Sequence, residues 1–201
     1  MRESERIGVF GGTFDPVHNA HCDIARTALE AAGLDRVIFV VAARPPHKNT
    51  GLHARAEERF AMVQAAIAHE PGMEVSRIEL DRGGLSYTVD TLTALHAEYP
   101  AASLFLIVGW DSLVDLLNWK DPRGILALAR LLAVARPGMH TEAPLDFAGR
   151  YALLPFEETA LSSTAVRERI VAGEPFDHLV PPAVADLIRE KGIYGASVAD
   201  R

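Results

Sequence analysis

The feature that most constrains the fold is the apolar run at residues 37–41, Val-Ile-Phe-Val-Val, which Pro45 and Pro46 bring to an end. A strand that is apolar at every position is typical of a parallel sheet covered on both faces, whereas a half-exposed strand alternates. Residues 104–108 form a second run of this kind, which stops at Gly109. The pattern therefore predicts an α/β fold with a mostly parallel central sheet.

Strand-like and helix-like segments alternate along the rest of the chain. Further strands are predicted at residues 7–10, 75–80, 131–135 and 151–154. Apolar side chains at helical spacing predict helices at residues 20–29, 60–67, 88–98, 113–117, 125–129, 163–171 and 183–191. We expect a Rossmann-like, doubly wound, mostly parallel sheet with helices on both faces and a small C-terminal helical part. Residues 1–195 would form a single domain, and residues 196–201 a disordered tail.

The composition excludes several classes of protein. Lys and Arg number 20 and Asp and Glu 27, a net charge of −7 that disfavours binding to nucleic acid. Cys22 is the single cysteine, so no internal disulfide can form. No apolar run reaches the ~18 residues of a membrane span, and residues 1–6 lack the apolar core of a signal peptide. We expect a cytoplasmic protein without a membrane partner; its oligomeric state stays open, a homo-oligomer included.

The segment GGTFDPVHNAH at residues 11–21 joins the first predicted strand to the first helix. Its two glycines allow a tight turn and the close approach of a ligand. The N–H groups at the start of a helix favour phosphate. His18 and His21 are three residues apart, so they share a helix face and can both donate hydrogen bonds to one anion.

Two other interpretations of this segment stay open. The glycines could form an ordinary turn beside surface histidines. Alternatively, the histidines could bind a metal together with Cys22 or Asp23, although no third ligand lies at a recognised spacing.

The segment LSSTAVR at residues 161–167 precedes an amphipathic helix. Ser162 or Ser163 suits the N-cap position, and Arg167 can reach back toward an anion at the same helix end. Hydroxyls, backbone amides and a guanidinium at one helix N-terminus make a phosphate site. An ordinary capped helix with a surface arginine is the alternative.

Together, the two segments resemble the H-x-G-H and S-S-T-x-x-R signatures of the nucleotidyltransferase superfamily. The stretch GGTFDPVH resembles, more closely, bacterial nicotinate-nucleotide adenylyltransferases, and the likeness extends from Ile7 to Tyr194 in at least five segments. Leu161 stands where isoleucine is common. Ala20 stands where the family usually has glycine, and alanine is tolerable there if φ is negative.

Two segments are similar to the family's pyridine-nucleotide site. In PPHK at residues 45–48, the resemblance places Lys48 near the substrate phosphates; taken alone, this is a surface loop. In SYTVDTL at residues 86–92, Ser86 or Thr88 is expected to cap a helix. The resemblance implies that Ser86, Tyr87 and Thr88 line the pyridine site, where the helix start can hold the nicotinate carboxylate.

Three further positions follow the later strands. Alone, Asp111 would be an N-cap, Trp119 a core aromatic and Trp110 a packing residue. The resemblance implies that Gly109 and Asp111 contact ATP and that Trp119 stacks on the pyridine ring. In the similar ARPG segment at residues 135–138, it places Arg136 near the phosphates.

The activity that the resemblance implies is transfer of AMP from ATP to nicotinate mononucleotide, giving deamido-NAD and pyrophosphate in NAD biosynthesis. His18, His21 and Arg167 would be catalytic. The residues expected to bind ATP are Gly11, Gly12, Thr13, Phe14, His18, His21, Gly109, Asp111, Arg136, Ser162, Ser163 and Arg167. Those expected to bind nicotinate mononucleotide are Lys48, Ser86, Tyr87, Thr88 and Trp119.

Mg²⁺ is the expected cofactor, bound mainly through the phosphates of ATP, so no protein ligand for a metal is predicted. Three alternatives stay open. The first is a nicotinamide mononucleotide or dual-specificity adenylyltransferase, and the second is a phosphopantetheine adenylyltransferase. The third is a nucleotide-binding module with impaired catalysis.

Overall fold

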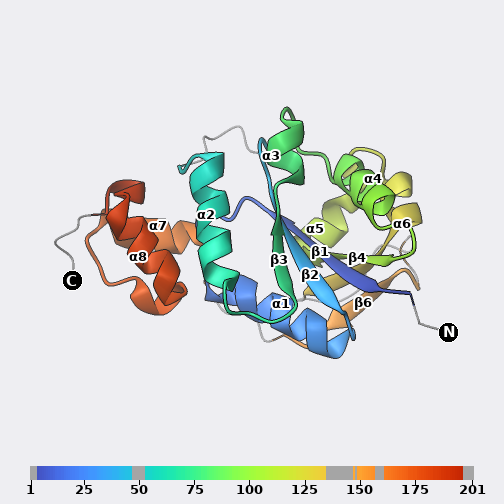
Figure 1. Cartoon of the computed structure of the whole chain (residues 1–201), viewed down its shortest axis with the longest axis horizontal. Coiled ribbons are helices and arrows are strands. Elements are labelled where there is room, and N and C mark those ends of the chain that lie inside the picture. The colour runs from blue at the N-terminus through green and yellow to red at the C-terminus, as the bar shows by residue number, and fades with distance from the viewer. Residues whose placement is uncertain (1–3, 47–52, 135–146, 148, 157–160, 197–201) are drawn as a thin grey trace.

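A computed structural model of the chain describes residues 4–46, 53–134, 147, 149–156 and 161–196. Its centre is a six-stranded parallel sheet with the order β3-β2-β1-β4-β5-β6 (Figure 1). The strands are β1 (Arg6–Gly12), β2 (Arg36–Val41), β3 (Met73–Ser76), β4 (Ser103–Gly109), β5 (Ala129–Val134) and β6 (Tyr151–Leu154). Since β1 pairs with β2 on one side and β4 on the other, the winding of the sheet reverses between β1 and β4. Ligands of such sheets bind at the carboxyl ends of the strands beside this reversal.

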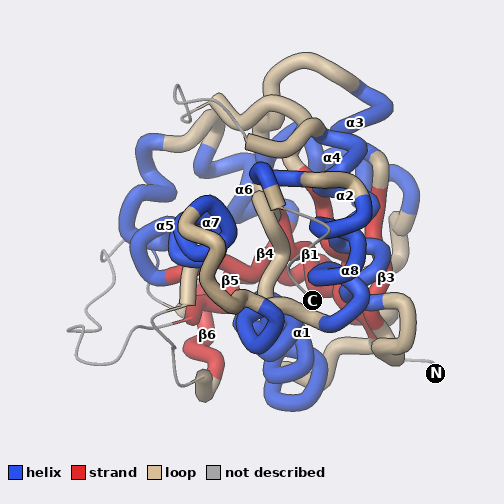
Figure 2. The backbone as a smooth tube through the Cα atoms, turned by 90° about the vertical axis from the view of Figure 1, so that its left-hand side faces the viewer, coloured by secondary structure: helices blue, strands red, loops and turns tan. Residues whose placement is uncertain are grey.

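Helices cover both faces of the sheet, as the sequence predicts. They are α1 (Asn19–Ala31), α2 (Ala56–Ile67), α3 (Ile78–Arg82), α4 (Thr88–Glu98), α5 (Trp110–Asp115), α6 (Pro122–Leu128), α7 (Ser163–Val171) and α8 (Pro182–Glu190). Helix α1 lies on one side of the strands and α4 on the other (Figure 2). Helices α7 and α8 lie beyond α2 at one end of the sheet, which is the small C-terminal helical part. None of the described helices is long and apolar enough to cross a membrane.

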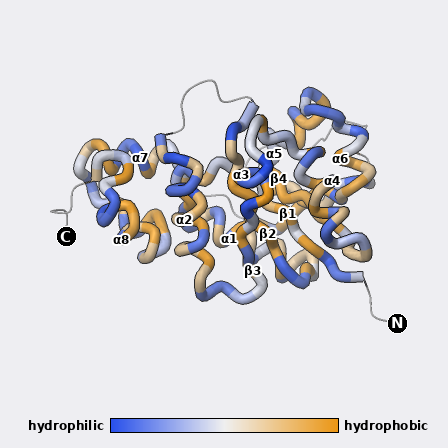
Figure 3. The backbone as a smooth tube through the Cα atoms, turned by 45° about the horizontal axis from the view of Figure 1, so that its top comes forward, coloured by the Kyte–Doolittle hydropathy of each residue, from blue (hydrophilic) through white to orange (hydrophobic). Residues whose placement is uncertain are grey.

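The apolar run in β2 shows why the sheet is covered twice. Val37 and Phe39 belong to the hydrophobic cluster under α1 and α2, whereas Ile38 and Val40 belong to the cluster under α4, α5 and α6. Successive side chains of a strand point to opposite faces, so the five residues of β2 from Val37 to Val41 are buried on one side or the other. Figure 3 shows the resulting concentration of hydrophobic residues along the central strands.

The strand predicted at residues 75–80 is wrong beyond Ser76. Strand β3 ends there, and α3 begins at Ile78. The Ser76 hydroxyl accepts a hydrogen bond from the Ile78 N–H at 3.2 Å, which turns the chain out of the sheet. Alternation over so few residues does not distinguish a short strand from a single helical turn.

Candidate active site

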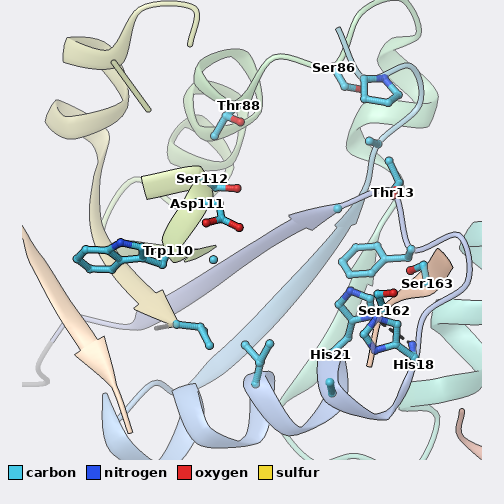
Figure 4. A pocket seen from close by; sticks show the side chains of 18 of the residues that line it. Thr13, His18, His21, Ser86, Thr88, Trp110, Asp111, Ser112, Ser162 and Ser163 are labelled. Atoms are coloured by element: carbon cyan, nitrogen blue, oxygen red, sulfur yellow. Dashed lines mark hydrogen bonds between the residues drawn. The ribbon is translucent and has the colours of Figure 1, made fainter. Parts of the chain in front are cut away.

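A cavity of about 620 Å³ opens at the carboxyl ends of β1 and β4, where the winding reverses. Side chains from both sequence signatures gather around it (Figure 4). The sequence-predicted residues that line it are Gly12, Thr13, Phe14, His18, His21, Ser86, Tyr87, Thr88, Gly109, Asp111, Trp119, Ser162, Ser163 and Arg167. Gly11 lines a smaller cavity nearby, and Lys48 and Arg136 lie outside the described residues.

The turn expected at Gly11 and Gly12 is made later in the chain. Strand β1 continues through both glycines, which pair with Val40 and Val41 of β2. The left-handed residue is Phe14, with a φ of 48°. A Cβ on Gly12 would lie 2.8 Å from the Phe14 ring, so Gly12 makes room for that ring where the chain leaves the sheet.

His18 and His21 stand at the start of α1, as the sequence predicts. His18 is the N-cap residue; its N–H donates to His21 Nδ1 at 3.2 Å, and the two rings stack with centroids 3.7 Å apart. His18 is only 5% exposed, and this burial lowers its pKa to about 4. Its Nδ1 is buried and has no hydrogen-bond partner in the part of the chain that the structure describes. The cavity is therefore lined by an imidazole that is uncharged at neutral pH.

Ala20 has the negative φ at which alanine is tolerable in place of glycine. It is the second residue of α1 and is buried, and its backbone is helical, so its φ is negative. A methyl group at this position imposes no backbone strain.

The second signature is tied directly to the first. The Ser162 hydroxyl caps α7 by accepting from the Ala165 N–H at 3.2 Å, which confirms the predicted cap. The Ser163 hydroxyl donates to the carbonyl of Pro16 at 2.8 Å, and Arg167 Nη1 donates to the carbonyl of Asp15 at 2.7 Å. The N-termini of α1 and α7 therefore meet at one side of the cavity, where both favour an anion.

The opposite side of the cavity is formed by the start of α4. The predicted cap of this helix by Ser86 or Thr88 is wrong, because Tyr87 holds the N-cap position and no side chain caps it. Ser86 instead bonds the loop after β2: its N–H donates to the Arg44 carbonyl at 2.9 Å, and its hydroxyl accepts from the Arg44 N–H at 3.2 Å. The first N–H groups of α4 therefore have no capping side chain to compete with a ligand.

Helix α5 and the residues after it complete the cavity. Gly109 is the N-cap of α5, so Asp111 lies inside the helix rather than capping it. Trp119 is half-buried, and its Nε1 donates to Asp115 at 3.3 Å. Trp110 is almost fully buried and meets the Tyr151 ring edge-on, which agrees with the predicted packing role.

Sequence reasoning missed Arg59, which is completely buried behind the Thr13 loop. Its guanidinium donates to the carbonyls of Thr13 at 2.7 Å, Ala54 at 3.3 Å and Ala43 at 3.4 Å. Desolvation lowers the pKa of Arg59. It follows two glutamates in α2, so the local pattern indicates an exposed face and gives no signal of burial.

Asp15 is a second residue that the sequence analysis left out. Its buried carboxylate accepts from the backbone N–H groups of His53 at 2.9 Å and Ala54 at 3.0 Å, and from the Tyr194 hydroxyl at 2.8 Å. Burial and the neighbouring Asp15 raise the pKa of Tyr194. Asp15 thus fixes the loop before α1 to the start of α2 and to the end of the described chain.

No group of three or more His, Cys, Asp or Glu side chains among the described residues could hold a metal ion. The interpretation of His18 and His21 as metal ligands with Cys22 or Asp23 therefore finds no support in this part of the chain. Cys22 is buried, and desolvation raises its pKa to about 11.

Comparisons with known proteins agree with this geometry. The family described as cytidylyltransferase-like matches residues 9–169. The "Probable nicotinate-nucleotide adenylyltransferase" of Thermus thermophilus is 46% identical over 190 residues, which cover 94% of this chain and 99% of that protein. The chain belongs to the nicotinate-nucleotide adenylyltransferase family. A relative of the same name from Saccharopolyspora erythraea is 39% identical over 96% of this chain and 92% of its own length.

Solved structures of this family's fold superpose over nearly the whole chain. Nicotinic acid mononucleotide adenylyltransferase of Plasmodium falciparum, complexed with NaAD, matches with a TM-score of 0.78 at 16% identity, covering 96% of this chain and 99% of that one. A second structure of the same protein, complexed with APC, matches equally well. At this identity the likeness shows the shared fold.

Proposed function

We propose that this protein transfers AMP from ATP to nicotinate mononucleotide and releases pyrophosphate, which is a step of NAD biosynthesis. The observation that carries the proposal is the junction of α1 and α7 at one cavity, made by the bonds from Ser163 to Pro16 and from Arg167 to Asp15. Two helix N-termini, two imidazoles and a guanidinium suit a polyphosphate better than any neutral ligand.

The reaction needs positioning more than it needs a general base. The phosphate of nicotinate mononucleotide has a second pKa of about 6, so it is already ionised at neutral pH. One of its oxygens bonds to the α-phosphorus of ATP as the bond from that phosphorus to the β-phosphate oxygen breaks. His18, His21 and Arg167 would hold the triphosphate in line and stabilise the charge that moves to pyrophosphate.

The nicotinate end of the acceptor would lie against α4. The uncapped N–H groups at Tyr87 and Thr88 suit a carboxylate, and the half-buried Trp119 offers a face for the pyridine ring. Gly109 and Asp111 line the same cavity, and the resemblance implies that they contact ATP. The family's name agrees with an acceptor that carries a carboxylate.

A magnesium ion would bind in this site mainly through the phosphates of ATP. Asp111 is the one carboxylate among the described residues of the large cavity. Mg²⁺ commonly binds through one or two carboxylates together with substrate phosphates and water. The ion would neutralise charge on the triphosphate, and Asp111 is the side chain placed to meet it or its bound water.

The test is pyrophosphate release from ATP and Mg²⁺ with nicotinate mononucleotide, nicotinamide mononucleotide or phosphopantetheine as acceptor. We expect fast release with the first and much slower release with the other two. Comparable rates with both pyridine nucleotides would establish dual specificity. Release with phosphopantetheine alone, or none from folded protein that still binds ATP, would refute the proposed acceptor or the proposed catalysis.

A matched pair of arginine variants links the activity to this site. Arg167→Lys removes the planar guanidinium, so we expect kcat/KM for ATP to fall by about 10-fold or more. Arg169→Lys is the control, because Arg169 lies on the same helix but interacts with Glu174 and the Pro175 carbonyl. Equal effects of the two substitutions would separate the reaction from the α1–α7 junction.

A further inference from the structure

A second cavity, of about 100 Å³, lies beside the start of α4, and Glu79 is one of the residues that line it. It shares Ser86, Thr88 and Trp119 with the large cavity, so the two adjoin at the proposed pyridine site. Its volume equals that of about three water molecules at ~30 Å³ each. It is far too small to hold a nucleotide.

Glu79 is held at this position by two neighbours. The Thr91 hydroxyl donates to Oε1 at 2.5 Å, and Arg82 Nη2 lies 3.9 Å from the same oxygen. Arg82 also donates to Thr91 Oγ1 at 3.2 Å. The three side chains tie α3 to the first turn of α4 and fix the orientation of the carboxylate.

The other carboxylate oxygen of Glu79, Oε2, accepts no hydrogen bond from the described residues. The residue is 7% exposed, and its Oε2 is buried with no hydrogen-bond partner in the described part of the chain. Burying a carboxylate oxygen without a partner is unfavourable, so such groups usually have a functional reason. Nothing in the proposed phosphate chemistry uses Glu79.

The start of α4 and Glu79 present opposite charges to the same ligand. The helix N-terminus carries a positive partial charge, and Glu79 carries a negative one. The base of nicotinate mononucleotide is a zwitterion, because its ring nitrogen is quaternary and positive while its substituent is a carboxylate. The helix start suits the carboxylate, and the buried anion suits the ring.

We propose that Glu79 is a specificity-determining residue that selects a positively charged pyridine ring, an inference that rests on the proposed function. Attraction between charges persists where the surroundings exclude water, as in a narrow cavity lined by buried strands. Arg82 offsets part of the negative charge but lies on the Oε1 side. Thr91 and Arg82 are positioning residues that hold the carboxylate.

The test compares wild-type protein with Glu79→Gln, which keeps the shape and an acceptor for Thr91 but removes the charge. We expect KM for nicotinate mononucleotide to rise about tenfold, while kcat and KM for ATP stay within about threefold. The second probe is the chemically reduced dihydropyridine form of the same nucleotide, whose ring is uncharged. Wild-type protein should bind the oxidised form at least about tenfold more tightly in competition assays, and Glu79→Gln should lose most of this preference.

Asp81→Asn is the matched control, since it removes an exposed carboxylate from the same helix, one that pairs with Arg77 and lines neither cavity. Its preference for the charged ring should stay close to that of wild-type protein. Equal loss of affinity for both ring forms in Glu79→Gln would show that Glu79 only supports α4 and would overturn the inference. If Glu79→Gln does not fold, equal binding of the two forms by wild-type protein decides against it.

The proposed function and this inference can fail separately. Folded wild-type protein that releases no pyrophosphate with nicotinate mononucleotide would contradict the function itself. An active wild-type protein with an unchanged KM in Glu79→Gln would overturn the role of Glu79 alone.

Discussion

The imidazole rings of His18 and His21 stack with their centroids 3.7 Å apart, and the backbone N–H of His18 donates to His21 Nδ1. Two cationic rings at this distance would repel each other. Burial lowers the pKa of His18 to about 4, so at neutral pH its ring is uncharged. The stack therefore forms before any ligand arrives, and an anion that binds there meets donors already in place.

The depressed pKa of His18 predicts a specific loss of stability in acid. Its pKa is 6.5 when exposed and about 4 in the folded protein, so between these values the unfolded chain binds the extra proton. The stability that the uncharged His18 contributes to the free energy of unfolding is fully present above pH 6.5 and is lost as the pH falls toward 4. It amounts to about 3 kcal/mol. Urea unfolding between pH 7 and pH 4 should show this slope in wild-type protein but not in His18→Asn.

Comparison with an exposed histidine isolates this effect from general acid denaturation. His69→Asn changes an exposed residue, so its pH dependence should match that of wild-type protein. If wild-type and His18→Asn lose stability in parallel over this range, His18 is not the group that titrates.

The same substitution should reduce catalysis at neutral pH. Asparagine is a good N-cap, so His18→Asn preserves the start of α1 while removing the imidazole. Loss of one preorganised donor to a developing charge lowers kcat by about 100- to 1,000-fold. Pyrophosphate release under saturating substrates measures kcat, and a thermal melt checks the fold. A kcat within about threefold of wild-type protein would remove His18 from the mechanism.

Arg59 should control both stability and the geometry of the site. Arg59→Met removes the donor to one buried and two partly buried carbonyls, among them that of Thr13 in the cavity wall. Leaving such groups unsatisfied costs about 1–3 kcal/mol each, so we expect the free energy of unfolding to fall by at least about 3 kcal/mol. Arg55→Met, at the exposed start of the same helix, should change it by less than about 0.5 kcal/mol. Similar losses in the two variants would contradict the role assigned to Arg59.

The sequence predicted those parts of the fold whose signal is local. The helix at residues 88–98 and the strand at residues 151–154 match α4 and β6, because apolar spacing and flanking turns determine them. Phe14 was not predicted to turn the chain, since a large aromatic residue rarely has a positive φ. Here the space above Gly12 and the packing of Phe14 against Phe10 stabilise that conformation.

The two signatures predicted residues that meet at one side of the cavity, but they did not predict which contacts hold those residues in place. Asp15 was noted only as part of a motif, although its partners include Tyr194, 179 positions away. Glu79 lies in a segment first interpreted as a strand, so its burial beside α4 was unpredictable. Both depend on contacts between segments distant in sequence, which periodicity and capping rules do not report.

Ala20→Gly tests the one departure from the family's first signature. Ala20 is buried in the first turn of α1 and lines the large cavity. Glycine in a helix interior costs about 0.5–1 kcal/mol relative to alanine, so the variant should be less stable by that amount in urea unfolding. Since the backbone at Ala20 is already helical, kcat and KM for ATP should change by less than about threefold. A large gain in kcat/KM for ATP would instead show that the methyl group keeps the triphosphate away from the helix N-terminus.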